Sequence, residues 1–350
     1  MKKTLLTIVF AVLSLAAHAQ DKTTDSTSRP AKWYDKIKLS GYGMLQYQFE
    51  DKEDNKHNYF NLRLMRLSLN GKIYDFDWRV QMQGTSAKGP GEPTVMLVDL
   101  YSEWVKYDAF RIKVGQFKRP FTFENPLHPI TQGWYSYAQV INKLAGFGDR
   151  TGEKNSAGRD IGIQIQGDVL KNASGRYLLH YQMGVFNGEG INIWDKDQCK
   201  DFIGGLWVMP IEGMRIGVFG WTGTRSGVGR KNRYALSAEY DKHEYTFRAE
   251  YIHSQGMGAD PALGDKADGW YISGIVPIIK SKLHAKARYQ TYRDNKDWNR
   301  SRTMYEVGVN YLFNKYMQLN LEYACVNDRT IANPDKHNYK FFDAQFDFRF

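Results

Sequence analysis

Basic side chains occur at positions in this chain where their spacing suits the binding of an oxyanion. Arg63 and Arg66 stand three residues apart within one apolar run. Lys118 and Arg119 are adjacent, and Arg159 opens a later run. An arginine guanidinium presents a planar fork of donors and stays charged, so it binds phosphate-like groups without proton transfer. Several weak sites in series would let an anion enter and leave, so these residues predict reversible anion binding.

Histidine offers no comparable pattern for catalysis or metal binding. His180 and His284 fall on the polar face of predicted strands, but neither has a nearby serine or carboxylate in a recognisable motif. The eight histidines lack the close pairing typical of metal ligands. The glycine-rich stretch 223–231 has the wrong spacing for a phosphate loop, and no helix pattern follows it, so we expect an external loop there. We therefore predict no catalytic residue, no metal site and no cofactor.

The segments that carry these basic residues alternate with a period of two, which is typical of β-strands. Within 59–70 the phase shifts near Leu64, so Arg63 and Arg66 share a face only if a β-bulge lies between them. Each run is long for a globular strand and suits a tilted strand that crosses a bilayer. Sixteen runs are predicted, near 37–50, 59–70, 72–84, 95–107, 109–116, 159–169, 176–187, 199–209, 213–224, 231–241, 243–255, 268–279, 282–293, 302–313, 315–326 and 337–350.

Short and long connections alternate between these runs. The short turns are predicted at 70–71, 107–108, 170–175, 210–213, 241–242, 280–281 and 314–315, and longer polar or glycine-rich segments separate the other strands. An even-stranded outer-membrane barrel needs this alternation, with turns on the periplasmic side and loops outside. The pattern predicts an all-β fold, a transmembrane antiparallel up-and-down β-barrel of 16 strands.

The last strand assigns the two faces of the barrel. Phe342, Phe346 and Phe348 alternate with Asp343 and Asp347. A row of phenylalanines on one side of a terminal strand would promote aggregation in water but suits contact with lipid. A soluble β-sandwich is the alternative reading of alternating aromatic residues. The barrel reading predicts that the polar residues face the lumen.

The chain begins with features of export. Residues 1–19 combine a basic start, an apolar run and a small-residue cleavage pattern, which predicts a signal peptide followed by a polar tail, 20–36. The net charge of +10 is dispersed along the chain and does not form a patch, so we expect no nucleic-acid partner. The predicted location is the outer membrane of a Gram-negative bacterium, in contact with its lipid.

Two further sets of residues would determine what passes through such a barrel. A sixteen-stranded barrel leaves an aqueous channel unless something narrows it. The aperiodic segment 117–158, the third external loop, is the candidate, because it is long and lacks any strand pattern. The lumen is nearly balanced in charge, since many carboxylates share the inward faces with a basic ladder. The predicted ladder comprises Arg79, Arg111, Lys113, Arg176, Arg215, Arg248, Lys286 and Arg288.

Three short motifs resemble the phosphate-selective porin O and P family. They are Gly-Gln-Phe-Lys-Arg-Pro-Phe at 115–121, Arg-Asp-Ile-Gly at 159–162, and Arg-Leu-Met-Arg-Leu at 63–67. The resemblance implies a sixteen-stranded homotrimeric porin with a basic ladder leading to a constriction that binds phosphate or polyphosphate. It carries over Arg63 and Arg66, whereas Leu64 stands where the family's pattern has another arginine.

Taken together, these features predict a porin for passive diffusion of small anions such as phosphate, through a channel narrowed by a loop with basic residues. The predicted anion-binding set is Arg63, Arg66, Lys118, Arg119 and Arg159. A general or other solute-specific porin without anion preference is the first alternative. A barrel enzyme or a structural surface protein is the second, and for either of these channel activity should be absent.

Overall fold

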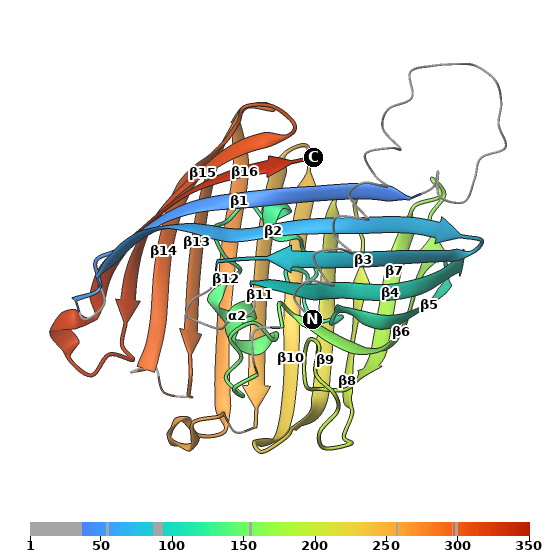
Figure 1. Ribbon diagram of the computed structural model, residues 1–350, viewed down its shortest axis with the longest axis horizontal. Coiled ribbons are helices and arrows are strands. Elements are labelled where there is room, and N and C mark those ends of the chain that lie inside the picture. The colour runs from blue at the N-terminus through green and yellow to red at the C-terminus, as the bar shows by residue number, and fades with distance from the viewer. Residues whose placement is uncertain are drawn as a thin grey trace, which may run out of the picture.

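The chain folds into one closed antiparallel barrel of sixteen strands, in which each strand pairs with the next and β16 pairs with β1 (Figure 1). The computed structural model describes residues 37–53, 56–86, 94–153, 156–256, 258–295, 297 and 300–350. The predicted signal peptide 1–19 and tail 20–36 lie outside the described residues. The strands are β1 (Lys38–Glu50), β2 (His57–Ile73), β3 (Phe76–Gly84), β4 (Val95–Tyr107), β5 (Phe110–Lys118), β6 (Arg159–Lys171), β7 (Tyr177–Phe186), β8 (Asp201–Val208), β9 (Met214–Arg225), β10 (Gly229–Lys242), β11 (Tyr245–Gln255), β12 (Lys266–Ile279), β13 (Leu283–Arg293), β14 (Ser301–Leu312), β15 (Met317–Asp328) and β16 (Asn338–Arg349).

All sixteen predicted strands are present, but some connections differ from the prediction. The turn predicted at 241–242 is formed by His243 and Glu244, and the one predicted at 107–108 lies one residue later. The Asn70-Gly71 turn is wrong: β2 continues to Ile73, and the turn is formed by Tyr74 and Asp75. Gly71 pairs with Trp78, whose indole lies so close that a Cβ on residue 71 would clash with it at 2.4 Å. The glycine therefore makes room for a side chain and does not bend the backbone.

The external loop predicted within 223–231 is also wrong in extent, because β9 runs to Arg225 and β10 starts at Gly229. Gly223 lies against the carboxylate of Asp201, where a Cβ would approach Oδ1 to 1.7 Å. Here again the glycine permits close contact within the barrel wall. Only 226–228 remain as a tight connection.

The predicted bulge in β2 is confirmed. Met44 of β1 pairs with Leu64, but the next residue, Leu45, pairs with Leu62, so Arg63 is the extra residue. The bulge returns Arg63 to the face that carries Arg66. Its guanidinium bonds to the buried side chain of Gln345 at 2.5 Å.

The two faces of the strands differ in burial as the alternating pattern predicts. In β10, Lys231, Arg233 and Glu239 are buried, whereas Tyr234 and Leu236 between them are exposed. In β16 the odd-numbered residues Asp343, Gln345 and Asp347 are buried. Buried polar side chains therefore point to the interior of the barrel, and apolar ones form its outer surface.

The segment 119–158 connects β5 to β6 and carries the short helices η3 (Pro129–Thr131) and α2 (Gln139–Leu144). It packs against inward-pointing side chains of β9 to β13, and α2 contacts β11, β12 and β13. Figure 1 shows α2 within the outline of the barrel. The two other short helices, η4 (Pro261–Leu263) and η6 (Pro334–Lys336), lie in later connections. No helix in the described part of the chain has the length and apolar character of a transmembrane helix.

Candidate functional site

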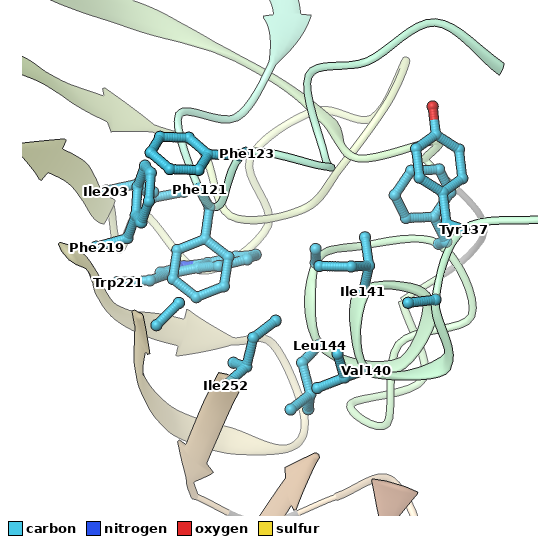
Figure 2. Packing of buried hydrophobic residues seen from close by; sticks show 14 of the residues in the cluster. Phe121, Phe123, Tyr137, Val140, Ile141, Leu144, Ile203, Phe219, Trp221 and Ile252 are labelled. Carbon is cyan, nitrogen blue, oxygen red and sulfur yellow. The ribbon is translucent and has the colours of Figure 1, made fainter. Parts of the chain in front are cut away.

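An apolar cluster fixes the loop 119–158 to one side of the barrel interior (Figure 2). Phe121 and Phe123 lie beside Phe219 and Trp221 of β9, with ring centroids 5.3–6.4 Å apart in edge-to-face arrangements. On the far side of the same cluster, α2 packs Leu144 toward Ile252 of β11, and both side chains are fully buried. Edge-to-face rings and buried aliphatic groups stabilise the docked loop.

Buried ion pairs secure the ends of this loop. Arg119 has no exposed surface, and its guanidinium contacts Glu153 at 2.9 Å and Asp160 at 2.8 Å. Burial alone would lower the pKa of Arg119, but these two carboxylates raise it above its ordinary value. Arg159 is likewise inaccessible and contacts Asp99 at 2.5 Å. Both arginines were predicted to bind anions. The structure corrects this, because each is enclosed and neutralised by carboxylates.

Carboxylate and amide side chains of the barrel wall also hold the loop backbone. Glu250 Oε1 accepts hydrogen bonds from the backbone N–H groups of Phe123 at 2.6 Å and Glu124 at 3.1 Å. The backbone N–H of Tyr135 donates to Glu322, and that of Gln139 donates to Gln290, each at 2.6 Å. The wall thus replaces the hydrogen bonds that the irregular loop backbone lacks. Sequence reasoning missed this role of Glu250 because its partners are backbone atoms.

Two enclosed cations have no carboxylate partner among the described residues. Arg66 is 1% exposed, and its Nε and Nη2 donate to the neutral Gln83 at 2.9 and 2.7 Å, while Nη1 has no partner there. Lys118 Nζ donates to the backbone carbonyls of Asn125 at 2.5 Å and Leu127 at 3.3 Å, and to the Tyr137 hydroxyl at 3.0 Å. Because a guanidinium stays protonated, the neutral partner Gln83 satisfies donors of Arg66 but leaves its positive charge in place.

Burial and the positive charge near Arg66 and Lys118 both lower the pKa of His128 in the loop. Burial, together with the nearby charges of Arg66, Arg79, Lys118 and Arg159, lowers the pKa of His128 to about 3. His128 is therefore neutral at physiological pH. Nothing in the sequence pattern singled out this residue, because it lies in the aperiodic segment.

The other two predicted cations near this cluster also have neutral partners. Arg63 bonds to Gln345 and lies 3.5 Å from the carbonyl oxygen of Trp134. Arg79 Nε donates to Asn70 Oδ1 at 2.7 Å. We define Arg63, Arg66, Arg79 and Lys118 as the cationic wall, since none has a carboxylate within ion-pair distance in the described residues.

Most of the remaining ladder is paired with acidic side chains. Arg111 contacts Asp168, Lys113 contacts Glu103, Arg215 and Arg248 contact Glu239, Lys286 contacts Glu322, and Arg288 contacts Glu306. Arg176 does not belong to the ladder. It lies in the turn before β7, where it donates to the carbonyls of Met209 and Pro210. The residues of the predicted ladder therefore differ in their partners, and only Arg79 among them belongs to the cationic wall.

Carboxylates gather on β16, which only β1 separates from β2. Asp343 accepts from Gln46 at 2.7 Å and Gln48 at 3.0 Å, and Asp347 accepts from Gln318 at 2.7 Å. Both carboxylates are buried, and one oxygen of each has no hydrogen-bond partner in the described part of the chain. The barrel interior therefore carries positive charge on β2, β3 and β5 and negative charge on β16.

The two inward-facing histidines do have carboxylate partners, contrary to the sequence-based expectation. His180 Nδ1 lies 2.6 Å from Asp168, and His284 Nε2 lies 2.8 Å from Glu244. Asp168 also binds Arg111, and no nucleophilic side chain is bonded to either histidine in the described residues. Over those same residues, no group of three histidine, cysteine or acidic side chains has the arrangement of a metal site.

A cavity of about 310 Å³ lies between the start of the loop and the wall from β3 to β9. Its lining includes the cationic wall residues Arg79 and Lys118, together with His128, Lys113 and Arg215. Aromatic rings orient several of these cations. Lys113 Nζ is 5.0 Å and the Arg79 guanidinium 5.9 Å from the centroid of Tyr101. A ring face attracts a cation without cancelling its charge.

A closed barrel with an apolar outer surface, a charged interior and a loop packed against its inner wall defines a channel protein of the outer membrane. Residues 39–177 match the family model described as phosphate-selective porin O and P, and residues 212–330 match the one described as Gram-negative porin. The two matches cover separate parts of the chain and together support its assignment to the porins, non-enzymatic channels of the Gram-negative outer membrane.

Solved porin structures share this fold at low sequence identity. OmpF of Salmonella typhi, in complex with daunomycin, aligns with a TM-score of 0.67 and 12% identity, covering 90% of this chain and 97% of that chain. An anion-selective porin from Comamonas acidovorans aligns with a TM-score of 0.67 and 10% identity, covering 90% of this chain and 99% of that chain. OmpT of Vibrio cholerae, in trimer form, aligns with a TM-score of 0.58 and 10% identity, covering 90% of this chain and 99% of that chain. The comparison with curated proteins gave no match.

Proposed function

We propose that this porin conducts small anions, phosphate among them, by passive diffusion through a barrel that the loop 119–158 narrows. The observation that carries the proposal is the pair Arg66 and Lys118. Both are enclosed basic side chains whose partners are neutral among the described residues. A buried charge without a counter-charge is unfavourable, so a passing anion is attracted to this place.

The arrangement also favours release. Arg66 and Lys118 already have acceptors for most of their donors, so an arriving anion competes with Gln83 and with loop carbonyls. Competition of this kind keeps binding weak, and conduction requires weak sites that an ion can leave. Arg63 and Arg79 extend the positive region along β2 and β3. Phosphate, with several oxygens and a double charge near neutral pH, gains more from guanidinium forks than chloride does.

Two comparisons support this proposal. The family model matched by 39–177 is described as phosphate-selective, and one solved structure of the same fold is an anion-selective porin. We also propose a homotrimer in contact with outer-membrane lipid. The trimer form of the Vibrio cholerae OmpT structure supports that assembly.

A general or other solute-specific porin without anion preference is the second candidate, and the carboxylates of β16 favour it. Asp343 and Asp347 each have one oxygen without a hydrogen-bond partner in the described residues, so they offer negative charge to a passing cation. If their field equals that of the cationic wall, the channel is neutral.

Phosphate block of chloride conductance in planar bilayers tests the proposal. Purified porin should conduct chloride, and added phosphate should reduce that conductance. Arg66→Gln and Lys118→Met should each weaken the block about tenfold, because each removes one attractive charge. Lys242→Gln, which changes a half-exposed lysine at the end of β10 paired with Glu212, serves as the control and should leave the block unchanged. Equal block in the wild type and both wall variants would contradict the proposal.

A further inference from the structure

The cavity beneath the loop has two chemically different kinds of lining. Arg79, Lys113, Lys118 and Arg215 provide positive charge, while Tyr101, Phe117, Phe123 and Trp207 provide aromatic rings. Phe117 and Phe123 are buried, but Tyr101 and Trp207 are only partly buried. A solute in the cavity would therefore contact ring surface as well as cations.

Contact with apolar walls does not favour the binding of inorganic phosphate. It is a small, strongly hydrated ion that gains from donors and charge, whereas ring surface gains from apolar partners that leave water. A volume of about 310 Å³ is within the range of pockets for organic molecules, and such pockets combine aromatic linings with a few charged groups. This cavity has that composition.

The charges in the lining favour an anion over a neutral or cationic ring. Asp99 is the one carboxylate among the described lining residues, and Arg159 neutralises it at 2.5 Å. Lys113 and Arg215 have acidic partners, Glu103 at 3.0 Å and Glu239 at 2.6 Å, which do not line the cavity. Arg79 and Lys118 have neutral partners in the described structure. The lining as a whole is therefore positive.

Cation–ring contacts fix the positions of the charges. Tyr101 lies between Lys113 and Arg79, with its centroid 5.0 and 5.9 Å from the two cationic groups. The Arg215 guanidinium is 4.1 Å from the centroid of Phe123. His180 stacks on Trp207 at 4.0 Å and 15°. Charges and ring surface thus alternate at fixed places along the lining.

We propose that this cavity is a binding subsite for organic anions in which a carboxylate or phosphate is attached to an apolar ring. The inference rests on the proposed function, because such a solute enters along the anion path. The charged end lies toward Arg79 and Lys118, and the ring lies against the partly buried surfaces of Tyr101 and Trp207. The porin then passes organic anions in addition to inorganic ones.

Benzoate and acetate form the probe pair, since they share a carboxylate and differ by a ring. Block of chloride conductance is measured for each in planar bilayers at equal concentrations, alongside inorganic phosphate. Benzoate should block about tenfold more strongly than acetate, as expected when part of a ring leaves water. Equal block by benzoate and acetate in the wild type overturns the inference, whatever the variants do.

Tyr101→Leu should bring the benzoate-to-acetate ratio close to one while phosphate still blocks. The matched control is Tyr339→Leu. Tyr339 also lies between a lysine and an arginine, Lys52 at 5.5 Å and Arg302 at 5.9 Å, but it does not line this cavity. Its ratio should equal that of the wild type. A ratio unchanged in Tyr101→Leu, or lost equally in Tyr339→Leu, contradicts the site.

The two proposals fail in different ways. If neither phosphate nor any carboxylate blocks chloride, the anion path itself is wrong. If phosphate blocks and benzoate does no better than acetate, only the subsite is wrong. Heat-dependent gel mobility confirms that each variant forms a barrel. Should Tyr101→Leu not assemble, Trp207→Leu removes the other ring surface and is expected to lower the ratio in the same direction.

Discussion

Two sides of the barrel interior use the same kinds of cations in opposite ways. On β10 and β13, Arg233 contacts Asp149, Arg288 contacts Glu306 and Lys286 contacts Glu322, at 2.6–2.7 Å. Each of these cations also donates to a loop carbonyl, of Leu144, Ser136 and Gly133 respectively. On β2, β3 and β5, the cationic wall residues bond to amide groups, backbone carbonyls and a hydroxyl.

The difference lies in what remains after the hydrogen bonds are made. A carboxylate partner satisfies the donors and cancels the charge, so the cation serves to hold the loop. A neutral partner satisfies donors and leaves the charge to act on the channel. The identity of the acceptor, more than the presence of an arginine, therefore separates an anchoring residue from a selectivity residue.

The largest expected effect follows from breaking a carboxylate-paired cation that secures the loop. Arg119→Ala leaves Glu153 and Asp160 buried without their cation, and loss of one partner of a buried pair costs about 3–5 kcal/mol. The loop should undock, so that single-channel conductance rises and protease cuts within 119–158. Conductance and cleavage equal to the wild type would show that the pair does not secure the loop.

The next largest effect is expected when a residue of the cationic wall is given a carboxylate partner. Gln83→Glu places a carboxylate where Arg66 now has an amide oxygen at 2.7 Å. The charge of Arg66 would be cancelled without removing the arginine, and phosphate block should weaken about tenfold. Gln83→Met, which removes the acceptor without adding charge, is the control and should retain the block. Equal block in the two variants would refute the role of the acceptor.

A smaller effect is expected from the carboxylates of β16. Asp343→Asn keeps the hydrogen bonds from Gln46 and Gln48 and removes one negative charge. Anion preference, measured as the chloride-to-potassium permeability ratio, should rise only about twofold, because Asp343 is buried in the barrel wall and channel solvent screens its field. An unchanged ratio would place Asp343 outside the conducting path, and a ratio that falls would contradict the predicted sign.

The smallest effect is expected at His128. Its pKa of about 3 keeps it neutral between pH 8 and pH 5, so His128→Gln should leave the permeability ratio unchanged at both values. Because the folded loop binds this proton more weakly than the unfolded chain, stability is lost as pH falls below the ordinary value of 6.5. More strongly acidic solution should thus loosen the loop. A permeability ratio that changes with pH only in the wild type would contradict this.

Much of the fold was predictable from the chain alone. The period of two gives all sixteen strands, and the phase shift near Leu64 gives the bulge at Arg63. The turn at 70–71 was mistaken because Gly71 resembles a turn residue, whereas it accommodates Trp78 across the strand pair. A local pattern does not show which side chain from the next strand covers a glycine.

The residue types of the candidate site were predictable, but their hydrogen-bond and ion-pair partners were not. Arg66 and Arg119 look equivalent in sequence, yet one meets Gln83 and the other meets Glu153 and Asp160. Strand register sets the first contact, and the path of an aperiodic loop sets the second. The alternating pattern could have identified Tyr101 as a lining residue, because it shares the inward face with Asp99 and Glu103. His128 gave no signal of any kind.

The zero-current potential across a bilayer that separates concentrated from dilute KCl tests the central claim most directly. The cationic wall predicts that chloride crosses faster than potassium, so the dilute side becomes negative. In Gln83→Glu this potential should move toward zero. A wild-type potential of zero, or a positive dilute side, would contradict the account.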